Sequence, residues 1–195
     1  NFNTSQLTTC HYMFNGCKSL EELNLSNFNT PNLTNINGMF DGCNNLKTLD
    51  IRNIDATEIL NYDEAFNNCS RLSHIYISDS FSNIINETGL TNSWKNVDTG
   101  EVFEEDETTH KTTIPIGAGE YLRTNYTVTF NSNGGSEASP SEIKIALDEL
   151  VTRPANPTRS GWTFVAWMWN GVKFNFDVAP NDDVDLIATW NKNQS

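Results

Sequence analysis

The chain has 195 residues, enough for one or two domains, and carries 25 acidic against 12 basic residues, a formal net charge of −13. This balance excludes a basic stripe for nucleic acid and disfavours anionic lipid, because both require clustered Lys and Arg. No apolar run reaches the roughly 18 residues of a membrane-spanning helix, so we expect no membrane insertion in this chain.

The first 80 residues repeat at an interval of 26, in the pattern F-x-x-C-x-x-L-x-x-L-x-[LI]. The positions that recur are Phe14, Phe40 and Phe66; Cys17, Cys43 and Cys69; Leu20, Leu46 and Leu72; Leu23, Leu49 and Ile75; and Leu25, Ile51 and Ile77. A fixed period with fixed apolar positions indicates that each repeat buries its hydrophobic face by stacking on its neighbours.

The same register extends upstream of Phe14. Leu7 aligns with Leu33, and Cys10 aligns with Ile36, so Cys10 fills an apolar position and does not belong to the cysteine column. Because the chain opens inside a repeat, we expect a fragment of a longer protein with three to four coils of an N-terminally truncated array.

Each repeat predicts one strand and one short helix. Apolar and polar residues alternate in Leu23–Leu25, Leu49–Ile51 and Ile75–Ile77, as in half-buried strands. Upstream, apolar residues recur at three- and four-residue steps, which predicts a short amphipathic helix; they are Leu33, Ile36, Met39 and Phe40. Strand, turn and helix together predict an α/β solenoid with a parallel sheet on one side.

Polar side chains beside the buried strand positions should point outward from this sheet. Arg52 and Tyr76 are among them, and both residue types are enriched in binding hot spots. We therefore predict a partner-binding face; the alternative is that these side chains are merely solvated. The nine candidates are Glu22, Asn24, Ser26, Thr48, Asp50, Arg52, His74, Tyr76 and Ser78.

The cysteine column predicts packing. Neighbouring strands lie about 4.8 Å apart, a distance that alone does not exclude a disulfide. A column of three cannot pair off completely, however, and its side chains project in parallel. We interpret Cys17, Cys43 and Cys69 as small buried hydrophobes, and their sulfurs would form a line and not a metal-binding tetrahedron.

The repeats resemble a known family. The pattern F-x-G-C-x-x-L-x-x-L-x-[LI]-[SR]-N-[FI]-[ND] is similar to the BspA-type leucine-rich repeat, also described as the mycoplasma lipoprotein repeat, of bacterial surface proteins. The resemblance implies a leucine-rich-repeat solenoid over residues 1–81. The third copy departs from the pattern after Ile77, so we assign residues 82–125 to a C-terminal cap and linker.

An acidic run, Glu104–Glu107, lies in this cap and linker. Hard cations take clustered carboxylates, but consecutive carboxylates cannot all face one ion, and no Asp-x-Asp-x-Asp-Gly spacing is present. We favour a solvated loop over a calcium site.

From Tyr126 onward the pattern is that of short strands rich in aromatic and β-branched residues. The Asn133-Gly134-Gly135 sequence predicts a tight turn. The expected extended segments are Tyr126–Phe130, Ile143–Ile145, Leu150–Val151, Trp162–Trp167 and Asp185–Trp190. Together they predict a small β-rich domain.

This second part resembles the Listeria–Bacteroides repeat, or InlB B-repeat, through Y-T-V-T-F-N-x-N-G-G, P-x-N-P-x-R-x-G-W-x-F-x-x-W and L-I-A-x-W. Where that family usually has Gly-Trp followed by Tyr, this chain has Ala166-Trp167 and Met168. The resemblance implies a β-grasp-like domain over residues 126–191 without catalytic residues. Its aromatic residues form either a core or a sugar-stacking platform.

The sequence predicts no enzyme and no cofactor or metal. His11, His74 and His110 lie in unrelated contexts, without a nucleophile or metalloprotease signature. The adjacent acidic residues of Glu21-Glu22 and Asp182-Asp183 would point to opposite faces of a strand, which is unsuitable for paired acid–base catalysis.

The two resemblances and the outward face together imply a bacterial cell-surface adhesin or internalin-like protein. We expect a monomer that binds a host or extracellular-matrix protein, or a glycan, outside the cell and anchored to the wall in the full-length protein. Two alternatives are a passive spacer or stalk, and a glycan-binding module that uses an exposed aromatic residue such as Trp169.

Overall fold

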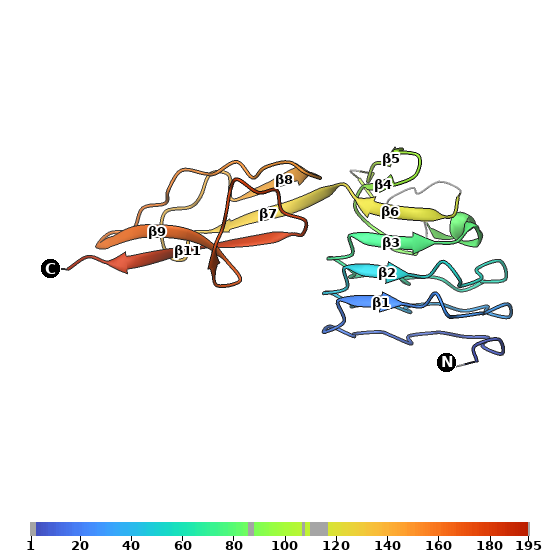
Figure 1. Ribbon diagram of the computed structural model, residues 1–195. Coiled ribbons are helices and arrows are strands. Elements are labelled where there is room, and N and C mark those ends of the chain that lie inside the picture. The colour runs from blue at the N-terminus through green and yellow to red at the C-terminus, as the bar shows by residue number, and fades with distance from the viewer. Residues whose placement is uncertain (1–2, 86–87, 107, 110–116, 195) are drawn as a thin grey trace. The chain divides into compact units, whose positions relative to one another are not determined.

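The computed structural model describes residues 3–85, 88–106, 108–109 and 117–194, and it divides into two compact units, Asn1–Thr124 and Asn125–Ser195. Each unit contains its own β-sheet (Figure 1). Glu107 of the acidic run and His110 lie outside the described residues. No helix among the described residues is both long and apolar enough to cross a membrane.

The first unit contains a six-stranded mixed sheet in the order β1-β2-β3-β6-β4-β5. The three predicted repeat strands pair in parallel, with Leu23 opposite Leu49 and Leu49 opposite Ile75. Beyond β3 the pairing becomes antiparallel. The strands are β1 (Glu22–Asn24), β2 (Thr48–Asp50), β3 (His74–Ile77), β4 (Trp94–Asn96), β5 (Val102–Phe103) and β6 (Gly119–Arg123).

The second unit contains a five-stranded mixed sheet in the order β10-β9-β11-β7-β8. Strands β11 and β7 pair in parallel at its centre, and every other pair is antiparallel. The expected segment Leu150–Val151 is not a strand. The strands are β7 (Asn125–Asn131), β8 (Glu142–Ala146), β9 (Trp162–Trp169), β10 (Val172–Lys173) and β11 (Val184–Lys192).

The helix predicted upstream of each strand is wrong, and the α/β assignment with it: the described chain is mostly β, with one short 3₁₀ helix, η1 (Asp79–Asn83). Residues 37–42 form turns because their amides bond in alternating directions. The Met39 N–H donates to the Ile36 carbonyl (2.9 Å), whereas the Phe40 N–H donates to the Ala65 carbonyl of the next repeat (2.9 Å). An α-helix needs every amide for its own i−4 carbonyl.

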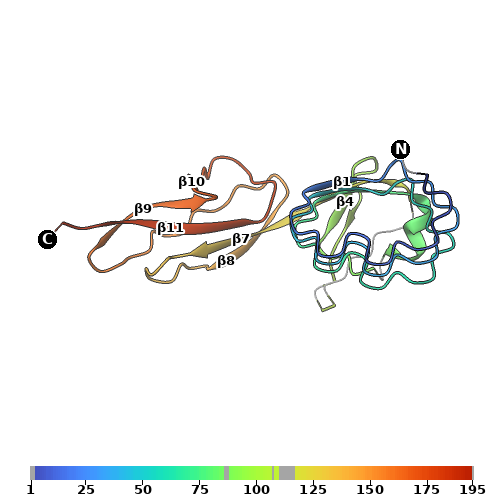
Figure 2. The ribbon, with the colours of Figure 1, turned by 90° about the horizontal axis from the view of Figure 1, so that it is seen from below.

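The repeats also pair on the side away from the strands. Asn35 forms parallel bridges with Thr9 and Asn61, the equivalent positions 26 residues away. Seen along the stack, the backbones of successive repeats nearly superimpose around a common interior (Figure 2). Each repeat therefore bonds to its neighbour along two ladders.

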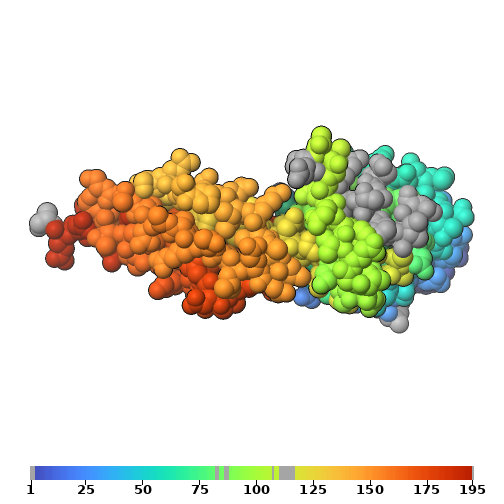
Figure 3. All heavy atoms as spheres, turned by 90° about the horizontal axis from the view of Figure 1, so that it is seen from above, coloured from blue at the N-terminus to red at the C-terminus, as the bar shows by residue number. Residues whose placement is uncertain are grey.

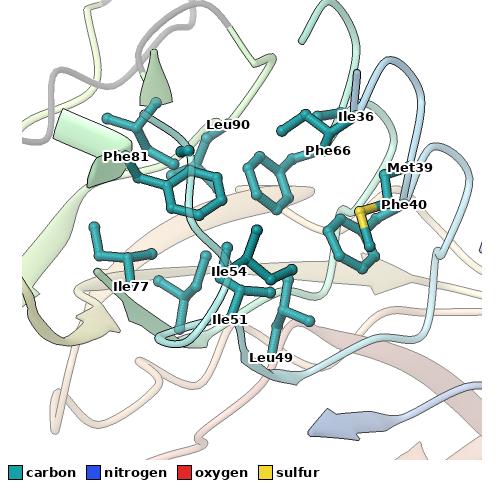
Figure 4. Close-up of a cluster of buried hydrophobic side chains, with 14 of the residues drawn as sticks. Ile36, Met39, Phe40, Leu49, Ile51, Ile54, Phe66, Ile77, Phe81 and Leu90 are labelled. Atoms are coloured by element: carbon teal, nitrogen blue, oxygen red, sulfur yellow. The ribbon is translucent and has the colours of Figure 1, made fainter. Parts of the chain in front are cut away.

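The interior between these ladders is filled by the recurring apolar positions. The rings of Phe40 and Phe66 stack with centroids 5.4 Å apart and an interplanar angle of 9°, and Phe14 continues the stack at 5.8 Å. Figure 4 shows Phe40 and Phe66 pointing into the same cluster as Leu49. Burying such a ring stabilises the fold by a few kcal/mol, so the fixed phenylalanine position anchors the stack.

The prediction of buried packing holds for Cys43 and Cys69 but is wrong for Cys17, which is exposed; all three thiols of the column are free. The Cys43 thiol donates to the Phe14 carbonyl (3.1 Å), and the Cys69 thiol donates to the Phe40 carbonyl (3.2 Å). Each thiol thus satisfies a carbonyl of the preceding repeat. Burial raises the pKa of Cys69 to about 12 and that of Cys10 to about 11, whereas Cys17, in the first repeat, is exposed.

Strands β4, β5 and β6 continue the first sheet beyond the last repeat. Strand β6 pairs with the edge of β3 that would otherwise be open to pairing with another chain. Trp94 of β4 is fully buried, and its indole N–H donates to the Thr91 carbonyl (2.8 Å). Figure 3 shows the atoms around β4 and β5 spread over this end of the unit.

Most aromatic side chains of the second unit form its core. Trp167 is 1% exposed and meets Phe130 and Phe164 edge to face, at centroid distances of 5.4 and 5.6 Å. Trp169 is half-buried: it packs against this core, meets the Phe174 ring edge to face at a centroid distance of 6.4 Å, and borders a surface hollow. The core interpretation therefore holds for Trp167, and Trp169 lies at the margin of the core, partly exposed.

The four thiols should differ sharply in reactivity, because only the thiolate reacts and burial suppresses it. With iodoacetamide at pH 8, we expect rapid alkylation at Cys17 and none at Cys10, Cys43 or Cys69 until the protein is unfolded. Peptide mass spectrometry over time measures this, and Cys17→Ser is the control that removes the fast phase. A second thiol modified at the Cys17 rate in the folded protein would contradict the thiol packing.

Candidate functional site

Six of the nine predicted binding residues lie in β1, β2 and β3 of the six-stranded sheet, and Ser26, Arg52 and Ser78 lie just beyond the ends of these strands. The register aligns Glu22, Thr48 and His74 in one row, and Asn24, Asp50 and Tyr76 in a second. Strand β6 extends the rows with Leu122 and Glu120. Lys95 of β4 lies opposite Leu122. We use the term outer face for the nine predicted residues together with Lys95, Glu120 and Leu122.

Several polar groups of the outer face are used by local hydrogen bonds. The Asn24 side-chain oxygen accepts from the Ser26 N–H (2.9 Å) and hydroxyl (2.6 Å). The Ser78 hydroxyl donates to the Ile54 carbonyl (3.1 Å). These three residues shape the turns after β1 and β3, which leaves them less bonding capacity for a partner.

Arg52 links the second and third repeats. Its Nη2 lies 2.7 Å from Asp50 Oδ2, and its Nε donates to both Asp50 oxygens at 2.9 and 3.1 Å. The guanidinium also sits over the Tyr76 ring, 4.4 Å from the centroid. This fork-to-carboxylate geometry and the ring contact fix a long side chain that would otherwise be mobile.

Asp50 was predicted to point outward on the partner-binding face, yet it is only 4% exposed, and Arg52 bonds to its carboxylate. Burial by itself would raise the pKa of the Asp50 carboxyl. The hydrogen bonds and charge of Arg52 outweigh burial, and the net effect lowers this pKa. Asp50 is therefore ionised at neutral pH and serves to hold Arg52.

Glu120 joins the third repeat to β6. Its Oε1 lies 2.7 Å from His74 Nε2 and accepts the Tyr76 hydroxyl at 3.2 Å. The His74 and Tyr76 rings lie 4.6 Å apart. Burial, followed by the charge of Glu120, raises the pKa of Tyr76, so its hydroxyl remains a donor at neutral pH.

A cleft of about 480 Å³ opens beside this network. We call it the Tyr76 cleft; its polar lining includes Arg52, Tyr76, Ser78, Asp79, Asp98 and Glu120. Three of the predicted binding residues, Arg52, Tyr76 and Ser78, thus meet at one concave site. The other six lie outside the cleft lining.

The site carries no metal-binding geometry. Within the described ranges, no group of three or more His, Cys, Asp or Glu side chains is close enough to hold an ion. What the arrangement offers is a fixed aromatic ring, a fixed guanidinium and carboxylate acceptors around a hollow, which are the components of a recognition surface.

A mostly β chain built from stacked repeats, with a polar sheet face, belongs to the class of repeat proteins. Residues 1–102, more than half of the chain, match the family described as "Mycoplasma protein of unknown function, DUF285", and the chain belongs to that family. Residues 126–189 match the Listeria-Bacteroides repeat domain. Both resemblances inferred from the sequence are confirmed.

Two curated proteins are similar to parts of the chain. Internalin H from Listeria monocytogenes serovar 1/2a is 29% identical over 98 residues, 47% of this chain and 17% of that protein. A putative membrane protein from Evansella cellulosilytica is 32% identical over 73 residues, 35% of this chain and 11% of that protein. The alignments thus span less than a fifth of these relatives. The matched repeat domains are typical of non-enzymatic surface proteins.

Sequence reasoning missed Glu120 and Leu122 because it placed no strand at residues 119–123. The alternation there is inverted: Leu122 lies on the outer face, while Arg123 is 3% exposed and donates to the Ser70 carbonyl (3.1 Å). An inward Arg beside an outward Leu hides the period-two pattern of a half-buried strand.

Asp50 should contribute a pH-dependent part of the stability. A carboxyl whose pKa is lowered by folding stabilises the protein above its unfolded pKa, and this contribution is lost as the pH falls through the folded pKa. We expect Asp50→Asn to lower the free energy of unfolding by about 1 kcal/mol at pH 7, and the difference to shrink as the pH falls through the lowered pKa of the folded Asp50 carboxyl. Urea denaturation in a series of buffers from pH 7 downward measures it.

The paired control is Arg52→Ala, which leaves a buried carboxylate without its partner. It should lower the melting temperature at pH 7, and the double variant Asp50→Asn with Arg52→Ala should recover part of that loss. Additive losses in the double variant would show that the two side chains are not coupled.

Proposed function

We propose that this chain is part of a bacterial cell-surface binding protein, adhesin- or internalin-like, whose outer face engages a host or extracellular-matrix protein. The observation that carries the proposal is the Tyr76 cleft, which is lined by Arg52 from the turn after β2, by Tyr76 of β3 and by Glu120 of β6. Tyr and Arg in concave, well-packed positions are the residues that most often dominate binding energy.

The proposal includes a leucine-rich-repeat solenoid at residues 1–81. Its support is the parallel register of β1, β2 and β3 at 26-residue steps and the bridges at Asn35 on the opposite side. A cap and linker at residues 82–125 and a β-grasp-like domain at residues 126–191 complete the organisation. Strands β7 and β11, parallel at the centre of the second sheet, support the β-grasp-like arrangement.

Preorganisation favours a binding role for the outer face. Arg52 is held by Asp50 and stacked on Tyr76, so both side chains occupy a defined geometry before a partner arrives. Ordering a free long side chain on binding costs about 0.5–1.5 kcal/mol. Because part of that cost is already met in the free protein, contacts to these two residues yield more net affinity.

Extracellular display on the bacterial surface, with a wall anchor in the full-length protein, is part of the same proposal. It is supported by the two surface-protein repeat domains and by the similarity to internalin H. The chain would act as a monomer without a cofactor. A passive spacer is the competing role, and it predicts that no substitution on the outer face alters binding.

A second candidate function is glycan binding by the second unit. Trp169 borders a hollow of about 260 Å³, whose wall includes Val172, Phe174 and Asn175. An accessible indole next to amide side chains is a surface on which a sugar ring stacks, with the amides as hydrogen-bond partners.

The outer-face function is tested with the full chain over immobilised fibronectin, laminin and type I collagen, by surface plasmon resonance. For a matrix protein that binds, Tyr76→Ala should weaken affinity about tenfold or more, since the residue lines the cleft and supplies its aromatic ring. Unchanged affinity in that variant would remove the outer face from the interaction.

The matched control is Leu60→Ala, which trims a side chain that is 77% exposed and outside the cleft lining. It should leave affinity unchanged. Thermal melting of both variants separates lost binding from lost folding.

Glycan binding is tested on a glycan array with Trp169→Ala beside wild type. If the second unit binds sugar, the variant should lose its array signal, because the stacking surface is gone, while Trp162→Ala, whose ring packs under Arg159, should keep it. An array signal that survives Trp169→Ala would exclude this site.

A further inference from the structure

We infer that the partner of the outer face presents a Lys or Arg side chain, and that this cationic group enters the Tyr76 cleft beside Glu120. The inference rests on the proposed protein-binding function and adds the chemistry of the partner. It rests on the charged side chains that line the cleft and on the hydrogen bonds that these side chains already form.

The lining of the cleft is negative in net charge. Asp79, Asp98 and Glu120 contribute three carboxylates, and Arg52 contributes one guanidinium. Arg52 is already paired with Asp50 through its Nε and Nη2 atoms, so its positive charge is compensated from within the sheet. An anionic partner would therefore meet repulsion here, whereas a cation would be attracted.

The carboxylates retain acceptor capacity. Glu120 uses Oε1 for both His74 and Tyr76, and no hydrogen bond among the described residues uses its Oε2. The Asp79 Oδ1 accepts a hydrogen bond from the Ala118 N–H, which leaves Oδ2 as an acceptor for a partner. For Asp98 the hydrogen bond in the described residues is made by its backbone N–H, to Asn96, and not by its carboxylate. Ionised oxygens with open lone pairs are strong acceptors for ammonium or guanidinium donors.

The arrangement fits an organic cation and not a metal ion. No three acidic, His or Cys side chains of the described residues come close enough together to hold an ion. A volume of about 480 Å³ is also far larger than an ion requires. A guanidinium or ammonium group at the end of a flexible side chain can hydrogen-bond to carboxylates that are not clustered. The methylene groups of that side chain can lie along the Tyr76 ring. The negative surroundings agree with the raised pKa of Tyr76, to which burial and then Glu120 contribute.

The test uses a short fluorescein-labelled peptide of alternating Arg and Ser, titrated with the full chain at about 0.15 M salt, where distant charges are screened. The cleft variant combines Asp79→Asn, Asp98→Asn and Glu120→Gln. Each change keeps the shape and the acceptor oxygen that the fold already uses. We expect this variant to bind the peptide about tenfold more weakly by fluorescence anisotropy.

The control variant combines Glu58→Gln, Asp63→Asn and Glu64→Gln, three exposed positions near the Asn61 bridge and outside the cleft lining. It changes the net charge by the same amount as the cleft variant does, and it should weaken peptide binding less than about twofold. Equal weakening of both variants would mean diffuse attraction to an acidic chain and would overturn the inference. Wild-type protein that does not bind the Arg peptide more tightly than a Glu-Ser peptide would overturn it as well.

The same variants separate this inference from the proposed function. If a matrix protein loses affinity with Tyr76→Ala but binds the cleft variant as tightly as wild type, the outer face is a binding site and its partner is not cationic at the cleft. If neither variant changes affinity for that matrix protein, both the cationic partner and the outer-face function fail.

Discussion

Backbone hydrogen bonds between consecutive repeats are the constraint on which the rest of the first unit depends. They run along the strands and also along the opposite ladder through Asn35, so each repeat is held to its neighbour at a fixed 26-residue register. Side chains 26 residues apart must then lie one above the other. The stacked phenylalanines, the thiol-to-carbonyl bonds and the rows of the outer face are all consequences of that single register.

The candidate site forms where this register ends. Strand β3 pairs with β2 in parallel on one edge and with β6 antiparallel on the other. The antiparallel strand brings Glu120, from outside the repeats, into the row of Tyr76, and the carboxylate then engages both His74 and Tyr76. The cleft therefore combines the repeat positions Arg52, Tyr76 and Ser78 with Asp98 and Glu120, which no repeat supplies, and this distinguishes it from the remainder of the face.

Much of this organisation follows from the sequence because two periods are visible in it. The 26-residue period gives the repeat strands and the shared face of Asp50 and Tyr76, and the period of two gives β7 and β9. The helix was predicted wrongly because apolar steps of three and four also suit turns whose amides bond to the next repeat, as at Phe40. Strand β6 was missed because the buried Arg123 finds its partner, the Ser70 carbonyl, only in the folded chain.

The position of the cleft has a consequence for the way such arrays vary. Tandem repeats gain and lose copies by duplication and deletion of whole units, and each parallel unit lengthens a sheet by about 4.8 Å. The cleft draws on the segments around β2, β3, β4 and β6 and on none from β1 or before it. Copy-number change upstream of β1 would therefore alter the length of the outer face while leaving the recognition chemistry at Tyr76 intact, so that reach and specificity can evolve independently.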